Sequence, residues 1–287
     1  DKLEAYKDAN YLKGGLVYAD WITTVSPTYS EEIKMPFYGE GLNGLLCARA
    51  GQLSGILNGI DYEEYNPETD SNLAYKYNAI NFRKLKVKNK LALQAELGLE
   101  QNEKKFMIGL VSRLTDQKGL DLVAYMMDQI CTEDTQLVVL GTGDSKYENM
   151  FRHFAWKYPE RVSANIFYSD ERSHKIYGSC DAFLMPSLFE PCGLSQLMSL
   201  RYGTVPIVRE TGGLKDTVQP YNEFESTGTG FSFANYNAHE MMDTINYAKH
   251  IYYDKKREWN KIIDRAMAAD FSWNMSARRY EDLYRML

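Results

Sequence analysis

After residue 105, short apolar runs alternate with longer segments whose apolar residues recur every three to four positions. The short runs are typical of buried strands, and the recurring spacing is typical of helices that cover them. The expected strands are Phe106–Val111, Gln136–Leu140, Ala164–Tyr168, Ala182–Met185 and Val205–Val208. Strands that alternate with helices in this way predict an α/β fold in which right-handed crossovers build a parallel sheet.

The first 55 residues carry much less of this pattern. They offer one strand, Trp21–Val25, and two helical pieces, Tyr29–Lys34 and the segment that ends before Gly14. This is too little apolar sequence for an independent core, so we interpret residues 1–55 as the end of a further domain. In this interpretation Gly14 or Gly15 caps the first helical piece.

A hinge and a final helix complete the expected organisation. The segment Gly55-Ile56-Leu57-Asn58-Gly59 is the hinge, and residues 56–274 form the unit that contains the sheet. The final helix takes residues 275–287, with Trp273 after Phe271 as a hydrophobic staple at its start.

Candidate chemistry gathers on the loop after the fourth expected strand. The stretch S-L-F-E-P-C-G-L-S-Q-L-M-S-L-R-Y-G begins at Ser187, and its apolar residues take helical spacing from Leu194 onward. Glu190 therefore lies between a strand and a helix, at the carboxyl edge of the sheet, where open α/β proteins bind ligands. A helix that begins at Gly193 or Leu194 would direct free backbone amides at an anion or a hydroxyl. The alternative is a carboxylate that only complements the helix dipole.

Two further strand-to-helix loops carry groups that suit a diphosphate. The segment G-L-V-S-R-L-T-D-Q-K-G places Arg113 and Lys118 after Phe106–Val111. Arginine offers a fixed fork of donors to phosphate oxygens, and lysine adds a compact charge. The loop E-T-G-G-L-K-D follows the last expected strand, and its Gly212 and Gly213 would let backbone amides approach an anion closely. Each loop alone is compatible with an ordinary surface turn, whereas the three in this order indicate a shared site.

Together with other segments, these motifs resemble the C-terminal portion of bacterial glycogen synthases and plant starch synthases. The matching segments are A-D-W-I-T-T-V-S-P from Ala19, G-I-L-N-G-I-D from Gly55, S-R-L-T-D-Q-K-G from Ser112, E-P-C-G-L-S-Q from Glu190, R-Y-G-T-V-P-I-V from Arg201 and T-G-G-L-K-D-T-V from Thr211. Members of this family are retaining glucosyltransferases with two Rossmann-like domains, the GT-B fold. The resemblance implies that this chain is the nucleotide-binding domain, a Rossmann-like parallel sheet with helices on both faces. It also implies that the last helix packs back on the N-terminal domain.

The resemblance further implies a reaction and a role for each motif residue. Glucose would pass from ADP-glucose to the non-reducing 4-hydroxyl of an α-1,4-glucan, with retention at the anomeric carbon. Arg113, Lys118 and Glu190 would be the catalytic residues, with the two cations at the diphosphate and the carboxylate at the glucose hydroxyls. Tyr168 would stack on the adenine, and Asn58 would reach the sugar side. The remaining substrate contacts, made largely through backbone groups, would be Cys192, Gly193, Leu194, Ser195, Thr211, Gly212, Gly213 and Leu214.

The expected mechanism uses neither a metal ion nor another cofactor. No Asp-x-Asp motif is present to hold a divalent cation against the diphosphate, and Arg113 and Lys118 would supply that charge instead. A double-displacement glycosidase needs two carboxylates around the bond that breaks, whereas Glu190 is the one carboxylate of these motifs on the donor side. We therefore expect front-face substitution through one ion-pair intermediate.

Composition and charge limit the class of partner. Asp and Glu number 39 against 33 Lys and Arg, a net charge of -6, whereas a protein that follows nucleic-acid phosphates usually needs a basic face. The four cysteines, at positions 47, 131, 180 and 192, show no metal-ligand or disulfide spacing, so we expect reduced thiols and no zinc site. No apolar run approaches the ~20 residues of a membrane helix, and the first residues lack a secretion signal. A cytoplasmic protein is expected, or a plastid protein if the source is a plant.

Two alternatives to a glucan synthase stay open. Other retaining glycosyltransferases of the same architecture, such as lipid- or sucrose-directed enzymes, share E-P-x-G but usually carry a second glutamate eight residues later, where this chain has Met198. The isolated chain is also compatible with a nucleotide-sugar-binding module that has no catalysis of its own. The nucleotide stays open between ADP and UDP, with ADP as the family default.

One apparent motif is set aside. The segment Lys13-Gly14-Gly15-Leu16 resembles the K-x-G-G-L donor loop of the family, but it lacks the intervening residue. It also directly precedes the A-D-W-I-T-T-V-S strand, whereas the family's loop lies near the start of the N-terminal domain. We expect that loop, and the family's N-terminal histidine that faces the sugar, to lie outside this chain.

Overall fold

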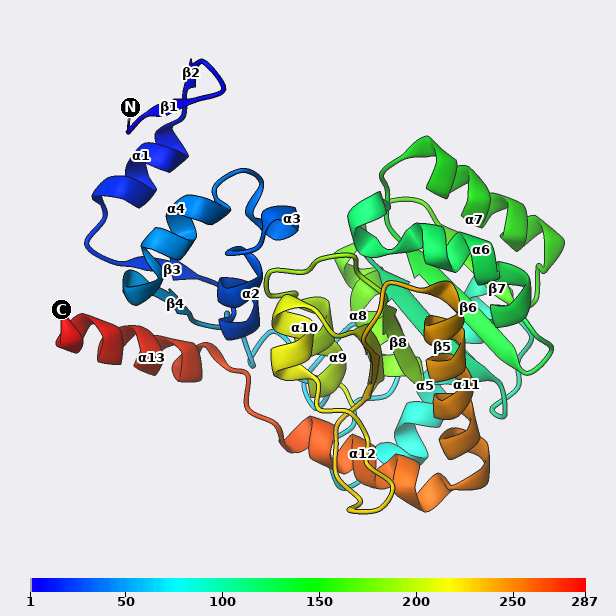
Figure 1. Cartoon of the computed structure of the whole chain (residues 1–287). Coiled ribbons are helices and arrows are strands. Elements are labelled where there is room, and N and C mark those ends of the chain that lie inside the picture. Colours follow the sequence, from blue (N-terminus) through cyan, green and yellow to red (C-terminus); the bar gives the residue numbers. More distant parts are fainter. Residues whose placement is uncertain (1) are drawn as a thin grey trace.

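A computed structural model, which describes residues 2–287, confirms the predicted α/β class (Figure 1). Its centre is a six-stranded sheet with the strand order β10-β9-β8-β5-β6-β7, and every neighbouring pair in it is parallel. The six strands are β5 (Phe106–Val111), β6 (Thr135–Leu140), β7 (Val162–Asn165), β8 (Ala182–Met185), β9 (Val205–Arg209) and β10 (Phe231–Phe233).

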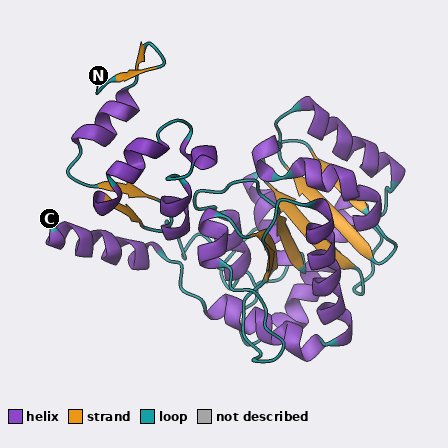
Figure 2. Ribbon diagram, viewed as in Figure 1, coloured by secondary structure: helices purple, strands orange, loops and turns teal. Residues whose placement is uncertain are grey.

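Helices cover both faces of this sheet (Figure 2). They are α5 (Phe82–Leu97), α6 (Leu120–Ile130), α7 (Ser145–Lys157), α8 (Asp170–Ser179), α9 (Ser195–Arg201), α10 (Gly212–Thr217), α11 (Ala238–Asp254) and α12 (Lys256–Ala268). α6 packs against α7 and α11, while α5 packs against α8 and α12 against α9. Because both faces are covered, the central strands are buried and their sequences read as continuous apolar runs. Within residues 2–287, no helix has the length and apolar character needed to cross a bilayer.

The residues before α5 form a smaller group of elements. They are β1 (Glu4–Ala5), β2 (Asp8–Ala9), α1 (Tyr11–Tyr18), β3 (Ile22–Thr24), α2 (Pro27–Glu32), α3 (Pro36–Gly39), α4 (Asn43–Ala48) and β4 (Leu53–Gly55), with a 3-10 turn at Ala50–Gln52. β3 confirms the strand expected over Trp21–Val25, and it pairs in parallel with β4. β4 ends at Gly55, the first residue of the expected hinge, and residues 56–59 of that segment belong to no helix or strand. α2 packs against α10 and so joins this group to the sheet-bearing unit.

The chain returns to the first elements at its C-terminal end, where α13 spans Trp273–Met286. Ile60 N–H donates to Phe271 O at 3.0 Å, and Ser276 Oγ donates to Leu57 O at 2.6 Å. The segment after β4 therefore lies beside the segment that leads into α13. Figure 1 shows α13, in red, on the side of the molecule where the first elements lie. The three predicted domain limits remain predictions.

Two predictions about helix ends are wrong. α1 runs through both Gly14 and Gly15 to Tyr18, so neither glycine caps it. Gly14 is buried, and a side chain there would require the Leu3 side chain to move. α13 begins at Trp273, so that residue is the first of the helix and not a staple before it.

The strand expected over Ala164–Tyr168 is displaced towards the N-terminus. β7 ends at Asn165, which pairs with Leu140 at the end of β6. β7 is an edge strand with β6 as its one neighbour, so it ends where β6 ends. The apolar residues that follow continue as a loop.

Candidate active site

The strand order reverses between β5 and β8. β6 and β7 extend the sheet on one side of β5, whereas β8, β9 and β10 extend it on the other. The loops after β5 and β8 therefore run in opposite directions away from this point. Such a topological switch point is where open α/β sheets bind ligands. Glu190 follows β8, and Lys118 ends the 3-10 turn Asp116–Lys118 that follows β5.

Lys118 and Glu190 meet at this switch point. Lys118 Nζ lies 3.1 Å from Glu190 Oε1 and 2.9 Å from Oε2. The two side chains are 16% and 7% exposed, and Ser187 Oγ donates a hydrogen bond of 3.0 Å to Oε2. The structure thus brings two of the three expected catalytic residues into direct contact. A buried pair of this kind makes the removal of one partner costly, because the other charge is left unpaired.

The two loops that carry this pair are joined through their backbones. Leu188 N–H donates to Gln117 O at 2.9 Å. Gly119 has a φ of +75°, in the left-handed region, and a side chain there would overlap the carbonyl group of Pro186. Glycine at the end of the S-R-L-T-D-Q-K-G motif therefore permits the close approach that sets Lys118 against Glu190.

Arg209 is a further residue of the site, and the sequence motifs do not single it out. It ends β9, and its Nη1 donates to Leu188 O at 2.7 Å and to Ser187 O at 3.4 Å. The guanidinium thus holds the chain just before Glu190 from the neighbouring strand. Its Nε is buried and has no hydrogen-bond partner among the residues that the structure describes. The sequence signal for this role is a cation at the carboxyl end of the strand that precedes T-G-G-L.

The T-G-G-L loop packs directly against the E-P-C-G loop. A methyl group at Gly212 would overlap Glu190 O, and one at Gly213 would overlap Cys192 O. Gly213 N–H also donates to Glu190 O at 3.1 Å. The paired glycines therefore serve the contact between the two loops.

The amides of the T-G-G-L loop all donate to protein acceptors. Those of Thr211 and Leu214 donate to nearby backbone carbonyls at 2.9 Å and 3.0 Å. Gly212 N–H donates to Glu32 Oε1 at 2.7 Å, and Thr211 Oγ1 donates to Glu32 Oε2 at 2.8 Å. Glu32 is buried at the end of α2 and takes the position at the start of α10 that we expected for a diphosphate. In this arrangement every amide of the loop has a protein acceptor, and the expected contact of these amides with a diphosphate remains a prediction.

Arg113 and Tyr168 make none of these contacts. The Arg113 guanidinium is exposed and has no hydrogen-bond or ion-pair partner within residues 2–287. Tyr168 is 89% exposed and lies three residues beyond the end of β7, in the loop before α8. The prediction that Tyr168 ends a strand is therefore wrong, but its ring is accessible to a ligand.

Cys192, Gly193, Leu194 and Ser195 form the turn that enters α9. Gly193 has a φ of +74°, and Gln196 Nε2 donates to Cys192 O at 2.8 Å and to Gly193 O at 3.0 Å. Ser195 is the first residue of α9, so the helix begins one or two residues later than predicted. Leu194 is 42% exposed and is the one member of this turn whose side chain is open to solvent to that extent.

Cys192 is buried against the segment that follows β4. Burial raises the pKa of its thiol to about 11, although a hydrogen bond with the Asn58 backbone opposes the rise. The thiol is therefore neutral near pH 7 and contributes shape rather than charge. This contact places Asn58 next to the E-P-C-G loop.

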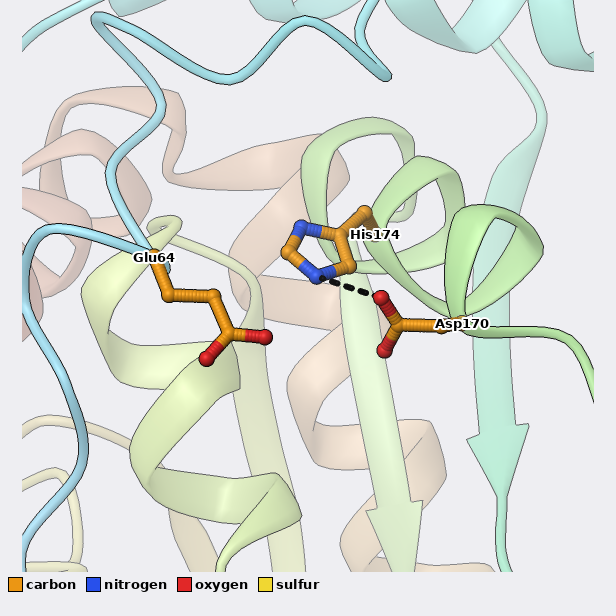
Figure 3. A group of neighbouring side chains, drawn as sticks. All are labelled: Glu64, Asp170 and His174. Carbon is orange, nitrogen blue, oxygen red and sulfur yellow. Dashed lines mark ion pairs between the residues drawn. The ribbon is translucent and has the colours of Figure 1, made fainter.

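Two other features lie apart from the ion pair. A cavity of about 510 Å³ between α5 and α12 borders Asp181, which precedes β8 and so lies at the opposite end of that strand from Glu190. Among the described residues, Glu64, Asp170 and His174 form the one group with metal-ligand spacing (Figure 3). That group includes neither member of the ion pair.

Sequence comparison identifies relatives of this chain. The family described as "Glycosyl transferases group 1" matches residues 97–265, and the family described as "Starch synthase catalytic domain" matches residues 1–48. The chain is 75% identical to a protein named glycogen synthase in Lachnospira eligens and 72% identical to one in Lachnoclostridium phytofermentans, in each case over 287 residues. Both matches cover 100% of this chain and 60% of the relative, so the chain spans less than two thirds of their length.

A solved structure with a similar fold is the catalytic domain of starch synthase IV from Arabidopsis thaliana bound to ADP and acarbose. The TM-score is 0.91 at 32% sequence identity, over 99% of this chain and 59% of that chain. Because nearly the whole chain is covered, the similarity includes the elements before α5 as well as the sheet.

Proposed function

Because this chain belongs to the group 1 glycosyl transferases, we propose that it forms the donor-binding part of a glycogen synthase. The complete protein would transfer glucose from ADP-glucose to the non-reducing end of an α-1,4-glucan, with retention. The relatives named glycogen synthase, at 75% and 72% identity, support this function. The similar starch synthase was solved with ADP, which supports ADP over UDP as the nucleotide.

The observation that carries the proposal is the contact between Lys118 and Glu190 at the switch point of the sheet. A glycosyl donor needs a cation near the departing diphosphate and hydrogen-bond acceptors near the sugar hydroxyls. Lys118 would turn its ammonium towards the diphosphate, whose negative charge grows as the glycosidic bond breaks. Glu190 would then accept hydrogen bonds from glucose hydroxyls in place of those from the ammonium.

Arg113 and Tyr168 would complete the donor contacts. The Arg113 guanidinium has no partner in the described chain, so its fork of donors is available to phosphate oxygens. The exposed Tyr168 ring would stack on the adenine. Binding at these two side chains displaces no existing protein hydrogen bond.

We propose front-face substitution for the chemical step. The bond between the anomeric carbon and the diphosphate oxygen breaks, and its electron pair leaves with the diphosphate. The glucan hydroxyl adds on the same face, and its proton passes to the departing phosphate oxygen. Glu190 is a poor nucleophile in this setting, because its oxygens would accept hydrogen bonds from the glucose hydroxyls and from Ser187 Oγ.

The glucan groove and the rest of the cleft are proposed to come from the part of the relatives that this chain does not match. Half of a cleft leaves the acceptor hydroxyl unoriented, and orientation contributes on the order of 7–11 kcal/mol to such reactions. A bacterial cytoplasm is the proposed setting, since the two relatives named above are bacterial proteins.

Binding and transfer measured on one preparation test this proposal. The 287-residue chain is titrated with ADP and with UDP by calorimetry, and incorporation of labelled glucose from ADP-glucose into glycogen is followed in parallel. We expect saturable binding of ADP, weaker binding of UDP and no incorporation until the complete protein is used. A chain that binds neither nucleotide would contradict the donor role. A complete protein that binds ADP-glucose but transfers nothing would favour a binding module without catalysis.

A further inference from the structure

A buried histidine on α8 points one ring nitrogen at a pair of carboxylates. His174 is 2% exposed, and its Nε2 has no hydrogen-bond partner among the described residues. Nε2 lies 3.7 Å from Asp170 Oδ2, one turn earlier on the same helix. Figure 3 shows the carboxylate of Glu64 on the other side of the imidazole, carried by the segment that follows β4. One ligand atom from each of the three residues lies within 4.8 Å of the other two.

The opposite ring nitrogen is held in place by a further carboxylate. His174 Nδ1 lies 2.7 Å from Asp70 Oδ2, a distance at which the N–H donates to the carboxylate. Asp70 is itself 6% exposed, and it accepts hydrogen bonds from Tyr202 Oη and from Asn72 N–H. The Tyr65 ring stacks on the imidazole with centroids 4.8 Å apart. These contacts fix the plane of the ring, and in the neutral imidazole they leave Nε2 as the nitrogen with a free lone pair.

We propose that Glu64, Asp170 and His174 bind a divalent transition-metal cation. Two carboxylates and one imidazole supply the oxygen and nitrogen donors that Zn²⁺ and Mn²⁺ take in proteins, and the two carboxylates neutralise the charge of the ion. Metal-bound histidines almost always give their other N–H to a carboxylate or a carbonyl group, as His174 gives its own to Asp70. The site goes beyond the proposed transfer reaction, since it includes none of the residues assigned to the donor.

The ion would join two parts of the chain that are distant in sequence. Glu64 belongs to the segment between β4 and α5, whereas Asp170 and His174 belong to the first turns of α8. Asp170 follows Tyr168 by two residues, so the bound ion would also anchor the loop that carries the proposed adenine platform. The competing interpretation is a protonated imidazole that bridges Asp70 and Asp170 without any metal.

Zinc titration of the complete chain distinguishes these interpretations. The protein is stripped with a chelator, and every variant carries Cys47→Ser because Cys47 is an exposed thiol that could bind zinc. We expect one equivalent of Zn²⁺ to bind the wild-type site. Glu64→Gln and Asp170→Asn should each raise the Kd at least tenfold, a loss of the size seen when metal-site contacts are removed. Both side chains are exposed, so these variants should fold.

His250→Gln is the matched control. His250 also pairs with an aspartate four residues away, Asp254, but this pair lies exposed on α11 and has no third ligand among the described residues. The Kd for Zn²⁺ should not change in this variant. A loss of binding in His250→Gln, or unchanged binding in both Glu64→Gln and Asp170→Asn, would overturn the proposal.

The nitrogen NMR signals of His174 give a second readout that needs no variant of this residue. Saturating Zn²⁺ should shift the Nε2 resonance to the range of a metal-bound nitrogen, while Nδ1 keeps its proton. A proton that stays on Nε2 at saturating Zn²⁺ would show that His174 is a protonated imidazole bridging Asp70 and Asp170. That result would contradict the proposed metal site.

Discussion

Lys118 and Glu190 stand 72 residues apart in the chain, yet one ammonium lies within 3.1 Å of both oxygens of the other side chain's carboxylate. Each residue therefore neutralises the other before any donor binds. A donor that draws Lys118 to its diphosphate must at the same time give Glu190 new hydrogen bonds. This coupling predicts that the two residues respond differently to nucleotide alone and to nucleotide with glucose attached.

Glu190→Gln should separate nucleotide binding from transfer. The neutral amide leaves the Lys118 charge free for the diphosphate, so ADP affinity should stay equal or rise. Transfer by the complete enzyme should fall on the order of 100-fold, because the sugar loses its charged acceptor. Calorimetry with ADP and glucose incorporation into glycogen measure the two effects. Glu225→Gln, at an exposed carboxylate, is the control, and a parallel loss of ADP affinity in Glu190→Gln would contradict the sugar-side role.

Arg113→Ala should weaken ADP binding by about 1.5–3 kcal/mol, the usual contribution of a charge-assisted hydrogen bond. The guanidinium touches nothing else in the described chain, so the melting temperature should not change. Arg113→Lys should also weaken binding, because the planar fork is lost. Arg257→Ala removes an exposed arginine from α12 and controls for net charge. Unchanged ADP affinity in Arg113→Ala would remove this residue from the site.

Gly213→Ala should destabilise the protein by about 1–3 kcal/mol through overpacking. The added methyl group would overlap Cys192 O and push the T-G-G-L loop away from the E-P-C-G loop. Gly15→Ala is the matched control, since a methyl group there meets nothing within 4 Å and the position lies inside α1. The control should stabilise slightly, by ~0.5–1 kcal/mol. Urea denaturation compares both variants with the wild type. An unchanged free energy of unfolding in Gly213→Ala would contradict the role of Gly213 in packing the two loops together.

Glu32→Ala should lower the free energy of unfolding by about 1–3 kcal/mol, because Gly212 N–H is left buried without an acceptor. Glu31→Ala removes a neighbouring, exposed carboxylate whose one ion pair within residues 2–287 is with Lys34, and it should cost no more than ~0.5 kcal/mol. The same urea titrations measure both. Equal stabilities would show that Glu32 does not hold α2 against α10.

Lys86→Met should change how stability depends on pH. Burial lowers the pKa of Lys86 to about 8, whereas an unfolded lysine keeps its proton until ~10.4. Between these two pH values the unfolded state binds more protons than the folded state. The free energy of unfolding of the wild type should therefore rise with pH relative to that of Lys86→Met, by at most ~1.4 kcal/mol per pH unit. Urea titrations from about pH 7.5 to about pH 9.5 test this, with exposed Lys84→Met on the same helix as control. A constant difference between wild type and Lys86→Met would contradict the lowered pKa.

The fold class and the position of the ion-pair residues follow from the sequence by itself. β5 and β8 are buried on both faces, so each has a continuous run of apolar residues in the sequence. Such a run can be recognised without knowing which strands lie beside it. Lys118 and Glu190 then fall on strand-to-helix loops, because motif and strand are adjacent in the chain. Shorter strands such as β10, with three residues, leave no such signal, since their identity depends on the neighbour they pair with.

The partner of each side chain was decided only by the tertiary structure. Gly212 N–H and Glu32 are 180 residues apart, and nothing local to either indicates that a carboxylate fills the start of α10. Arg209 and His174 likewise acquire their roles from neighbouring strands and loops. Sequence patterns report how a residue relates to its own helix or strand, whereas these contacts arise when the sheet and the crossover bring separate loops together.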